Sequence, residues 1–263
     1  MLQVYASGIP KNFMYKPQYA NGTDDLKMIF DKEVFSYPKS IELIKDLLKI
    51  STSANESDII LDFFAGSGTT AQAVMELNEE DGGNRQFILV QIDEEIKEEK
   101  SKVAYDFCKN ELKSDNPAIS DITTERVRRA SAKITAKTTT KFAKENMDLG
   151  FKLYDLKPKP KLISDEKGAL RLMTNADLSA NDKALNLSLQ SGKTLDKPIE
   201  IVIKDKLYKC EDSYFCVECD ESVLKTLSQT SDEYIYIDAY SDINLEHFLN
   251  LDARFKERLN VMY

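Results

Sequence analysis

The sequence has no long hydrophobic run and no leader-like beginning. No uninterrupted apolar stretch approaches the ~18 residues that a membrane-spanning helix requires. The first residues, Met1–Tyr5, do not place a basic segment before an apolar one, as a secretory signal would. With 42% hydrophobic and 31% charged residues, the composition is that of an ordinary globular protein. We therefore expect a cytoplasmic protein that folds its 263 residues into one large domain or two modest ones.

Cysteine and histidine are too scarce to suggest a disulfide scaffold or an obvious metal site. Of the four cysteines, Cys210, Cys216 and Cys219 cluster, and the last two form a Cys-x-x-Cys pair. A tetrahedral zinc site would need a fourth ligand from elsewhere, and the single histidine, His247, has no partner one helical turn away. Zinc remains the lesser alternative. We favour a half-buried strand over residues 214–219 with small thiols packed inside, and we expect no metal.

The acidic balance argues against indiscriminate nucleic-acid binding, but the charge is uneven. The net charge is −9, whereas residues 126–144 contain seven basic side chains and no acid. Residues 205–246, in contrast, contain eleven acids and three lysines. Any contact with DNA should therefore come from the basic stretch, in which we single out as candidate DNA-binding residues Arg126, Arg128, Arg129 and Lys133. The alternative is a solvated helix face, or internal pairing of these side chains with acids.

A helix is predicted directly before the first apolar strand. Over residues 38–48 the apolar positions fall on one helical stripe, and Pro38 suits the first turn. The stripe consists of Ile41, Ile44, Leu47 and Leu48. The residues before about Asn21 are rich in turn formers and aromatics, so we expect them to form a connector.

Residues 58–91 are typical of one strand–helix–strand crossover of an α/β sheet. Residues 58–64 form a short apolar run of the kind buried on both faces of a parallel sheet. This run passes through a glycine turn into a helix-like segment, 69–77, and then into a second apolar strand, 87–91. The order predicts a right-handed crossover. A long charged helix is expected next, over residues 94–113.

The second half of the sequence predicts a basic helix, a break and a further α/β domain. The helix should start at a capped segment, Asp121–Thr124, and run to about Asn146, before a strand over 151–154. The Lys-Pro-Lys-Pro-Lys segment at 157–161 interrupts regular structure, so we place a boundary there between domains 1–157 and 158–263. In the second domain we expect strands over 199–204, 214–219 and 233–240, with helices near Glu221 and after Asn244.

The glycine turn, residues 62–70 (Asp-Phe-Phe-Ala-Gly-Ser-Gly-Thr-Thr), is the most informative segment. Glycines after a buried strand allow a tight turn and close approach of a ligand. The helix behind them presents free N–H groups and a positive dipole end, worth ~0.3–1 kcal/mol to a nearby anion. No Gly-Lys-Ser/Thr follows, which excludes a P-loop. The turn also satisfies the permissive dinucleotide pattern, so a nicotinamide-dependent oxidoreductase stays as an alternative.

An acid at the end of the strand favours S-adenosylmethionine over a dinucleotide. Asp62 lies four residues before Gly66, where its carboxylate could accept hydrogen bonds from an ammonium group. The turn would then hold a carboxylate, and an amino acid moiety carries both groups. A pyrophosphate would be repelled by this aspartate. The second strand ends at Gln91, with Asp93 two residues further on, where a ligand for ribose hydroxyls is expected.

Several of these segments resemble the modification (Mod) subunits of type III restriction-modification systems. The similarity runs through Phe35–Ser40, Asp62–Thr70, Arg85–Gln91 and Ile122–Ala130, and continues to Leu245–Leu251. The resemblance implies a beta-class DNA methyltransferase that methylates adenine at N6 and uses S-adenosylmethionine. It also implies DNA, a second Mod subunit and the restriction (Res) subunit as partners.

The resemblance carries cofactor-binding roles to particular positions of this chain. Three positions match the segment that lines the methionine end of the cofactor: Phe35, Lys39 and Ser40. Six match the cofactor loop: Asp62, Phe64, Gly66, Ser67, Gly68 and Thr69. Gln91 stands where many methyltransferases have a glutamate for the ribose, and Asp93 is expected to share that role.

The catalytic signature of this family, Asp-Pro-Pro-Tyr, does not occur in the sequence, whose seven prolines include no adjacent pair. That motif holds the amine of a flipped adenine. We therefore expect no catalytic residue here and a partial Rossmann-like class I methyltransferase sheet. This S-adenosylmethionine-binding half would precede a smaller α/β C-terminal domain, and the chain would be inactive without an upstream half. A non-catalytic module that docks the Res subunit or a second Mod subunit is the alternative from another functional class.

Overall fold

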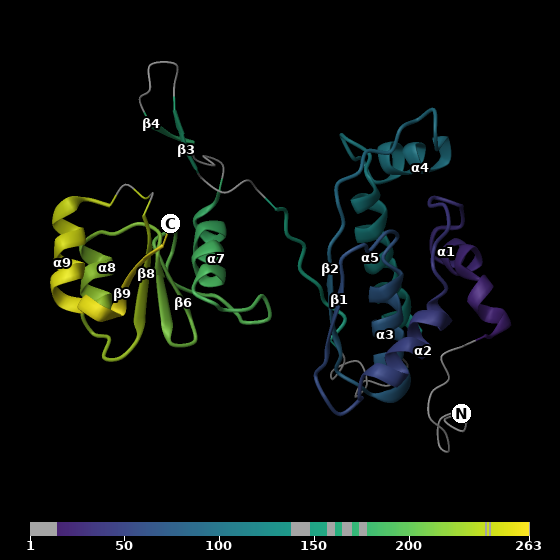
Figure 1. Ribbon diagram of the computed structural model, residues 1–263, viewed down its shortest axis with the longest axis horizontal. Coiled ribbons are helices and arrows are strands. Elements are labelled where there is room, and N and C mark those ends of the chain that lie inside the picture. Colours follow the sequence, from purple (N-terminus) through teal and green to yellow (C-terminus); the bar gives the residue numbers. More distant parts are fainter. Residues whose placement is uncertain are drawn as a thin grey trace. The chain divides into compact units, whose positions relative to one another are not determined.

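The computed structural model describes residues 15–137, 148–156, 161–164, 170–173, 178–239, 241 and 243–262. The chain divides into two compact units, Met1–Tyr154 and Asp155–Tyr263, and each mixes helices with strands (Figure 1). No helix within the described ranges is long and apolar enough to cross a membrane. The predicted α/β class is confirmed. Residues 157–160 of the expected boundary, and Lys141 and Lys144 of the basic stretch, lie outside the described residues.

The first unit is built around a strand–helix–strand motif. Its elements are η2 (Pro17–Ala20), α1 (Gly22–Phe30), α2 (Ile41–Ser51), β1 (Ile59–Asp62), α3 (Thr69–Asp81), β2 (Gln86–Leu89), α4 (Lys102–Asp106), the π-helical η3 (Phe107–Glu111) and α5 (Ile119–Lys137). β1 and β2 are parallel, in a register that pairs Ile59 with Gln86 and Asp62 with Leu89. The strand, turn, helix and strand predicted over residues 58–91 are therefore confirmed.

The helices of this unit cover one face of the two strands (Figure 1). On that face Ile60 and Phe87 pack against buried side chains of α2 and α3, and Phe87 and Leu89 pack against those of α3 and α5. On the opposite face Ile59 is 56% exposed and Leu61 is 49% exposed. The prediction that this run is buried on both faces is wrong, because the described residues supply helices to one side only.

The start of α2 is fixed by a neighbouring helix and not by proline. The helix begins at Ile41, so Pro38 lies before its first turn, and the backbone N–H of Ile41 donates to Asp25 Oδ2 at 3.0 Å. Asp25 of α1 thus caps α2 from outside. The predicted stripe is correct for Ile41 and Leu48, which are buried, but wrong for Leu47, which is exposed.

Two charged residues occupy buried positions of α2 because each has an opposite charge beside it. Lys45 pairs with Glu80 of α3, and Asp46 pairs with Lys16 at 2.5 Å. Such partners compensate the loss of hydration that burial imposes on a charge. The helix therefore turns a partly charged face inward, which a stripe of apolar residues does not reveal.

The predicted helix over residues 94–113 is wrong in its first half. The Ile96 N–H donates to the Pro117 carbonyl at 2.8 Å, and the Ile119 N–H donates to the Glu94 carbonyl at 3.0 Å. These bonds pair residues 94–96 with the segment before α5, so the backbone is not available for helical bonds. α5 itself begins at Ile119, before the predicted start, and Asp121 Oδ2 accepts from the Ala118 N–H at 3.0 Å.

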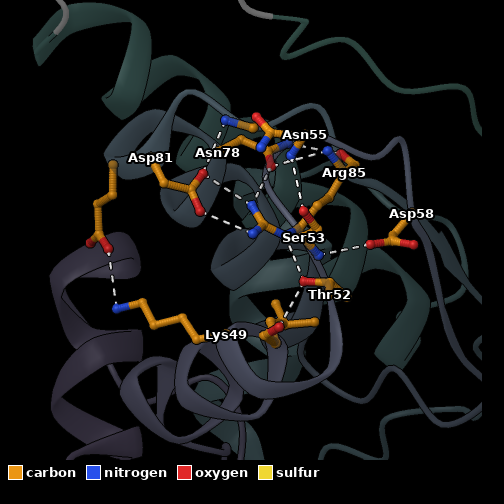
Figure 2. Close-up of polar contacts among 11 residues, drawn as sticks. Lys49, Thr52, Ser53, Asn55, Asp58, Asn78, Asp81 and Arg85 are labelled. Carbon is orange, nitrogen blue, oxygen red and sulfur yellow. Dashed lines mark hydrogen bonds and ion pairs between the residues drawn. The ribbon is translucent and has the colours of Figure 1, made fainter. Parts of the chain in front are cut away.

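A buried arginine fixes the amino ends of the two strands. Arg85, just before β2, makes a bidentate contact with Asp81 at the end of α3, with Nη1–Oδ1 and Nη2–Oδ2 distances of 3.0 and 2.9 Å (Figure 2). Its Nε donates to Thr52 Oγ1 at the end of α2, at 2.7 Å. Asn78 accepts from the Arg85 backbone N–H at 3.1 Å. These bonds hold α2, α3 and β2 together at the end opposite the glycine turn.

The second unit contains a five-stranded sheet with helices on both faces. Its elements are β3 (Lys161–Ser164), β4 (Leu170–Met173), α7 (Ala180–Gln190), β5 (Glu200–Ile203), β6 (Leu207–Cys210), β7 (Ser213–Cys216), α8 (Glu221–Leu227), β8 (Tyr234–Asp238), α9 (Leu245–Phe255), η4 (Lys256–Arg258) and β9 (Leu259–Met262). The strand order is β5-β6-β7-β8-β9, antiparallel from β5 to β7 and parallel from β7 to β9. β3 and β4 form a separate antiparallel pair. Side chains of α8 and α9 pack in one buried cluster and those of α7 in another.

The predictions for the second unit are partly confirmed. The strands expected over 199–204, 214–219 and 233–240 correspond to β5, β7 and β8, although Tyr240 lies outside the described residues. The helices near Glu221 and after Asn244 start at capping residues, since Asp220 and Asn244 accept backbone N–H groups of the first turn. β6, β9 and α7 were not predicted. The strand predicted at 151–154 is wrong, because these residues are exposed and pair with no strand among those described.

Candidate functional site

The glycine turn follows β1 and lies at the carboxyl ends of the two parallel strands, where α/β folds commonly bind ligands. Gly66 and Gly68 have φ angles of +54° and +79°, which glycine adopts without strain. The Gly68 N–H donates to the Ala65 carbonyl at 2.8 Å, and the Ala65 N–H donates to the Val90 carbonyl at 3.2 Å. The turn is therefore tied to the chain that follows β2.

Gly68 is needed for contact with a helix as well as for its backbone angle. A Cβ atom built on Gly68 would lie 3.2 Å from the carbonyl oxygen of Thr123 in α5. The Thr123 hydroxyl in turn donates to the Gly66 carbonyl at 2.5 Å. The close approach that the glycines permit is thus made in part by α5, which supports the turn from behind.

Asp62 keeps acceptor capacity for a ligand. Its Oδ1 accepts from the Phe64 N–H at 3.0 Å, and its Oδ2 accepts from Thr70 Oγ1 at 2.5 Å. A carboxylate has about four acceptor positions, so two neutral donors do not saturate it. Across the described ranges no lysine or arginine forms an ion pair with Asp62. The carboxylate is half-buried and has no ion-pair partner within the described ranges, which fits an incoming ammonium group.

Gln91 and Asp93 have different surroundings. Gln91 Oε1 accepts from the Gly66 N–H at 2.8 Å, and Gln91 Nε2 donates to the Ile92 carbonyl at 2.9 Å. Asp93 is exposed, and its Oδ1 accepts from the Ser120 hydroxyl at 2.5 Å. Gln91 therefore braces the turn, and the ribose contact expected of both residues stays a prediction.

The other expected cofactor residues border the turn in two ways. Phe35 is half-buried, and its ring lies 3.4 Å from where a Cβ of Gly66 would be, whereas Phe64 is 85% exposed. Lys39 is exposed, and its backbone carbonyl accepts from Thr69 Oγ1 at 3.4 Å. Ser40 is buried, and its hydroxyl donates to the Gln18 carbonyl at 2.9 Å. Phe35 and Lys39 thus lie close to the turn and Phe64 extends from it into solvent, while the Ser40 hydroxyl bonds within the fold.

Arg126 was expected to contact DNA from the surface, but the structure places it in the core. The side chain is fully buried, and its guanidinium donates to Gln72 in α3 and to the hydroxyl oxygens of Ser67 and Thr69 in the turn. A DNA contact by Arg126 is therefore excluded in this conformation. The signal that could have placed it correctly is helical spacing, since Ile122, Arg126 and Ala130 are four residues apart and all buried.

The other three candidate DNA-binding residues of α5 lie outside the core but have partners of their own. Arg128 is largely exposed and pairs with Glu125 one turn earlier. Arg129 donates from Nε to Glu125 Oε1 at 2.8 Å, and its guanidinium lies 5.1 Å from the ring centre of Phe30. Lys133 Nζ is 3.4 Å from the Met28 carbonyl oxygen. The alternative of internal pairing thus describes Arg128 and Arg129, and DNA contact by these residues stays a prediction.

The cysteines of the second unit are packed as small apolar groups. Cys210, Cys216 and Cys219 are buried free thiols, and the ring Nδ1 of His247 donates to the Cys219 carbonyl at 2.9 Å. No group of three metal-type side chains occurs among the residues that the structure describes.

The chain is similar to known DNA methylases. The sequence pattern of the DNA methylase family matches residues 9–102. Over 98 residues the chain is 49% identical to the EcoPI Mod subunit, a type III restriction-modification enzyme of Escherichia phage P1. It is 40% identical over 135 residues to the StyLTI Mod subunit of Salmonella typhimurium, and 38% identical over 138 residues to the EcoP15I Mod subunit of Escherichia coli. The resemblance to type III Mod subunits inferred from the sequence is confirmed.

These relatives are much longer than the shared segment. The three matches cover 36%, 51% and 52% of this chain, but only 15%, 18% and 18% of the respective relatives. The chain thus spans less than a quarter of the length of the curated relatives it matches.

Proposed function

On the premise that residues 9–102 belong to the DNA methylase family and that the chain is a relative of type III Mod subunits, we propose that it binds S-adenosylmethionine as part of a DNA adenine-N6 methyltransferase. The observation that carries this proposal is the glycine turn between β1 and α3, with the cation-free carboxylate of Asp62 beside it. No comparison favours the nicotinamide oxidoreductase or the purely structural module.

The residues at the turn match the chemistry of the cofactor's amino acid end. Asp62 would accept hydrogen bonds from the ammonium group. The carboxylate would meet the first turn of α3, whose N-cap, Gly68, has no side chain to occupy the free N–H groups. The exposed ring of Phe64 would offer a stacking surface to the adenine, and Gln91 and Asp93 would receive the ribose hydroxyls.

The bound cofactor would supply an activated methyl group on a sulfonium centre. The contribution of this chain is to bind and orient that group, since transfer depends on alignment of sulfonium, methyl and target amine. The sequence carries no Asp-Pro-Pro-Tyr motif for the flipped base. We propose that a polypeptide with that motif completes the site, and that DNA, a second Mod subunit and a Res subunit are partners of the complete enzyme.

Calorimetric titration of S-adenosylmethionine into the chain tests the proposal. Asp62→Asn keeps one acceptor oxygen for the Phe64 N–H and places an NH2 group that can donate to the Thr70 hydroxyl, but it removes the charge that an ammonium group requires. Hydrogen bonds to charged groups contribute about 1.5–3 kcal/mol, so affinity should fall roughly 10- to 100-fold. The matched control is Asp58→Asn, at the other end of β1, where Oδ2 accepts from the Ser53 N–H at 3.0 Å (Figure 2). Equal affinities of all three proteins would refute the site.

Methylation assays test whether this chain needs a second polypeptide, with the base-binding motif, for methyl transfer. Transfer of tritiated methyl groups to mixed-sequence duplex DNA should stay at background with this chain alone. It should appear when a polypeptide that carries the Asp-Pro-Pro-Tyr motif is added. Robust transfer by the chain alone would show that it contains a base-binding motif of another kind.

A further inference from the structure

Arg126 carries a buried positive charge next to the glycine turn, and each hydrogen bond that it forms within the described residues is to a neutral group. Its Nε donates to Gln72 Oε1 at 2.8 Å. Its Nη1 donates to Ser67 Oγ at 2.8 Å and to Thr69 Oγ1 at 2.7 Å. Its Nη2 has no hydrogen-bond partner among the described residues. The guanidinium is therefore aimed into the turn and is incompletely satisfied.

The charge of Arg126 is retained but not neutralised. Burial lowers the pKa of Arg126 to about 10, against the opposing effect of the Asp25 and Glu76 carboxylates nearby. The side chain is thus protonated at neutral pH. Neither carboxylate forms an ion pair with Arg126 in the part of the chain that the structure describes. A buried charge without a direct ion pair is unfavourable for folding, and an anion bound close by would relieve it.

The other buried arginine of this unit shows the contrast. Arg85 is also almost fully buried, but its guanidinium makes a bidentate ion pair with Asp81 (Figure 2). That arrangement satisfies both charge and geometry within the fold. Arg126 has no such carboxylate, although it lies next to the turn that is expected to receive the carboxylate of the ligand.

We propose that Arg126 is a positioning residue that gives the glycine turn its affinity for a carboxylate, that of the ligand's amino acid end. This inference rests on the proposed function. The N–H groups of the first turn of α3 contact the carboxylate, and the charge of Arg126 adds to the positive end of the helix dipole. Arginine only donates hydrogen bonds. The hydroxyl oxygens of Ser67 and Thr69 therefore accept from Arg126, and their own O–H groups donate elsewhere. Arg126 thereby holds the turn in place and orients its hydroxyl groups, without contacting the ligand itself.

The test compares two ligands in calorimetric titrations of the full chain. S-adenosylhomocysteine carries the amino acid end, and 5′-methylthioadenosine has the same nucleoside and thioether without it. Arg126→Gln, which keeps hydrogen-bonding groups but loses the charge, should weaken S-adenosylhomocysteine binding at least tenfold relative to wild type. Its effect on 5′-methylthioadenosine should stay below about twofold. Arg126→Lys, which keeps the charge, should recover most of the lost affinity.

Arg85→Gln is the matched control, because it removes an equally buried arginine from the opposite end of the strands. It should lower the melting temperature and leave the ratio of the two ligand affinities unchanged. An equal loss of both ligands in Arg126→Gln, or equal affinities in the Gln and Lys variants, would overturn the inference while the proposed function stands. If wild type binds neither ligand, the proposed function and this inference both fail. Should Arg126→Gln not fold, a Lys variant that folds but has lost the preference for S-adenosylhomocysteine would equally overturn it.

Discussion

The side-chain oxygen of Gln91 accepts a hydrogen bond of 2.8 Å from the backbone N–H of Gly66. Gln91 follows β2 and Gly66 follows β1, so this bond joins the carboxyl ends of the two parallel strands. The Gln91 amide also donates to the Ile92 carbonyl at 2.9 Å, which fixes its orientation. A residue expected to contact the ribose thus also shapes the turn that would hold the amino acid end.

Replacement of Gln91 should separate these two roles. Gln91→Ala removes the acceptor of the Gly66 N–H and should destabilise the fold by about 1 kcal/mol. Gln91→Glu keeps an acceptor for the Gly66 N–H but loses the donor to the Ile92 carbonyl, so the protection of the Gly66 amide should survive even where stability falls. Chemical denaturation measures both, and hydrogen exchange at the Gly66 amide reports the bond directly. Unchanged exchange in Gln91→Ala would show that the bond does not hold the turn.

Gly68 should be the less replaceable of two glycines with similar backbone angles. Gly68→Ala and Gly82→Ala both place a Cβ at positive φ, which costs about 1–2 kcal/mol. Only at Gly68 does the new Cβ also crowd the Thr123 carbonyl. A Cβ on Gly82 has no atom of the described chain within 4 Å, apart from its own chain neighbours. Thermal unfolding should therefore show a larger loss for Gly68→Ala. Equal losses would mean that α5 moves aside without cost.

Arg128 is the residue of α5 best suited to test DNA contact, since it is the most exposed of the four candidates. In the complete enzyme, Arg128→Ala should weaken DNA binding uniformly across sequences. It should also lower the slope of log affinity against log salt by about 0.9 if one phosphate contact is lost. Arg129→Ala is the comparison, because loss of its packing on Phe30 should lower stability. An unchanged slope in Arg128→Ala would remove this helix from the DNA interface.

The uncovered face of β1 and β2 should make the chain associate with itself. Ile59, Leu61 and Ile88 expose apolar side chains there, and β1 has no second strand neighbour among the described residues. Exposed apolar strands of this kind promote aggregation. Light scattering should show concentration-dependent growth that Leu61→Lys reduces. A clean monomer at high concentration, with cooperative unfolding, would contradict this expectation.

Local signals in the sequence were enough for the crossover and the glycine turn. Two apolar runs, around Ile60 and Ile88, form the strands, and the glycines between them form the turn. These elements depend mainly on residues close in sequence, so the local pattern predicts them correctly. The sequence was a weaker guide to which face of each helix points into the core. The basic charge of Arg126 predicts a DNA contact, yet its spacing from Ile122 turns the side chain inward, where its guanidinium donates to Ser67 and Thr69.

Other errors arose where distant segments override local preference. Residues 94–101 are rich in helix-forming charged residues, but Ile96 bonds to Pro117 instead of to its own helix. Leu47 is exposed while Asp46 is buried, because Lys16 lies where it can compensate that carboxylate. In each case the deciding partner is more than twenty residues away in sequence, which a pattern within one window cannot report.

The second unit has helices on both faces of its sheet and two buried clusters of its own, one with α8 and α9 and one with α7. Each cluster draws its side chains from this unit alone, so we expect the unit to keep its fold when the first unit unfolds. Substitutions in the first unit should leave it intact, so the chain should melt in two separate heat-absorption peaks. Proteolysis near residue 155 would then release a fragment that still folds, and loss of ligand binding could be assigned to one half of the molecule.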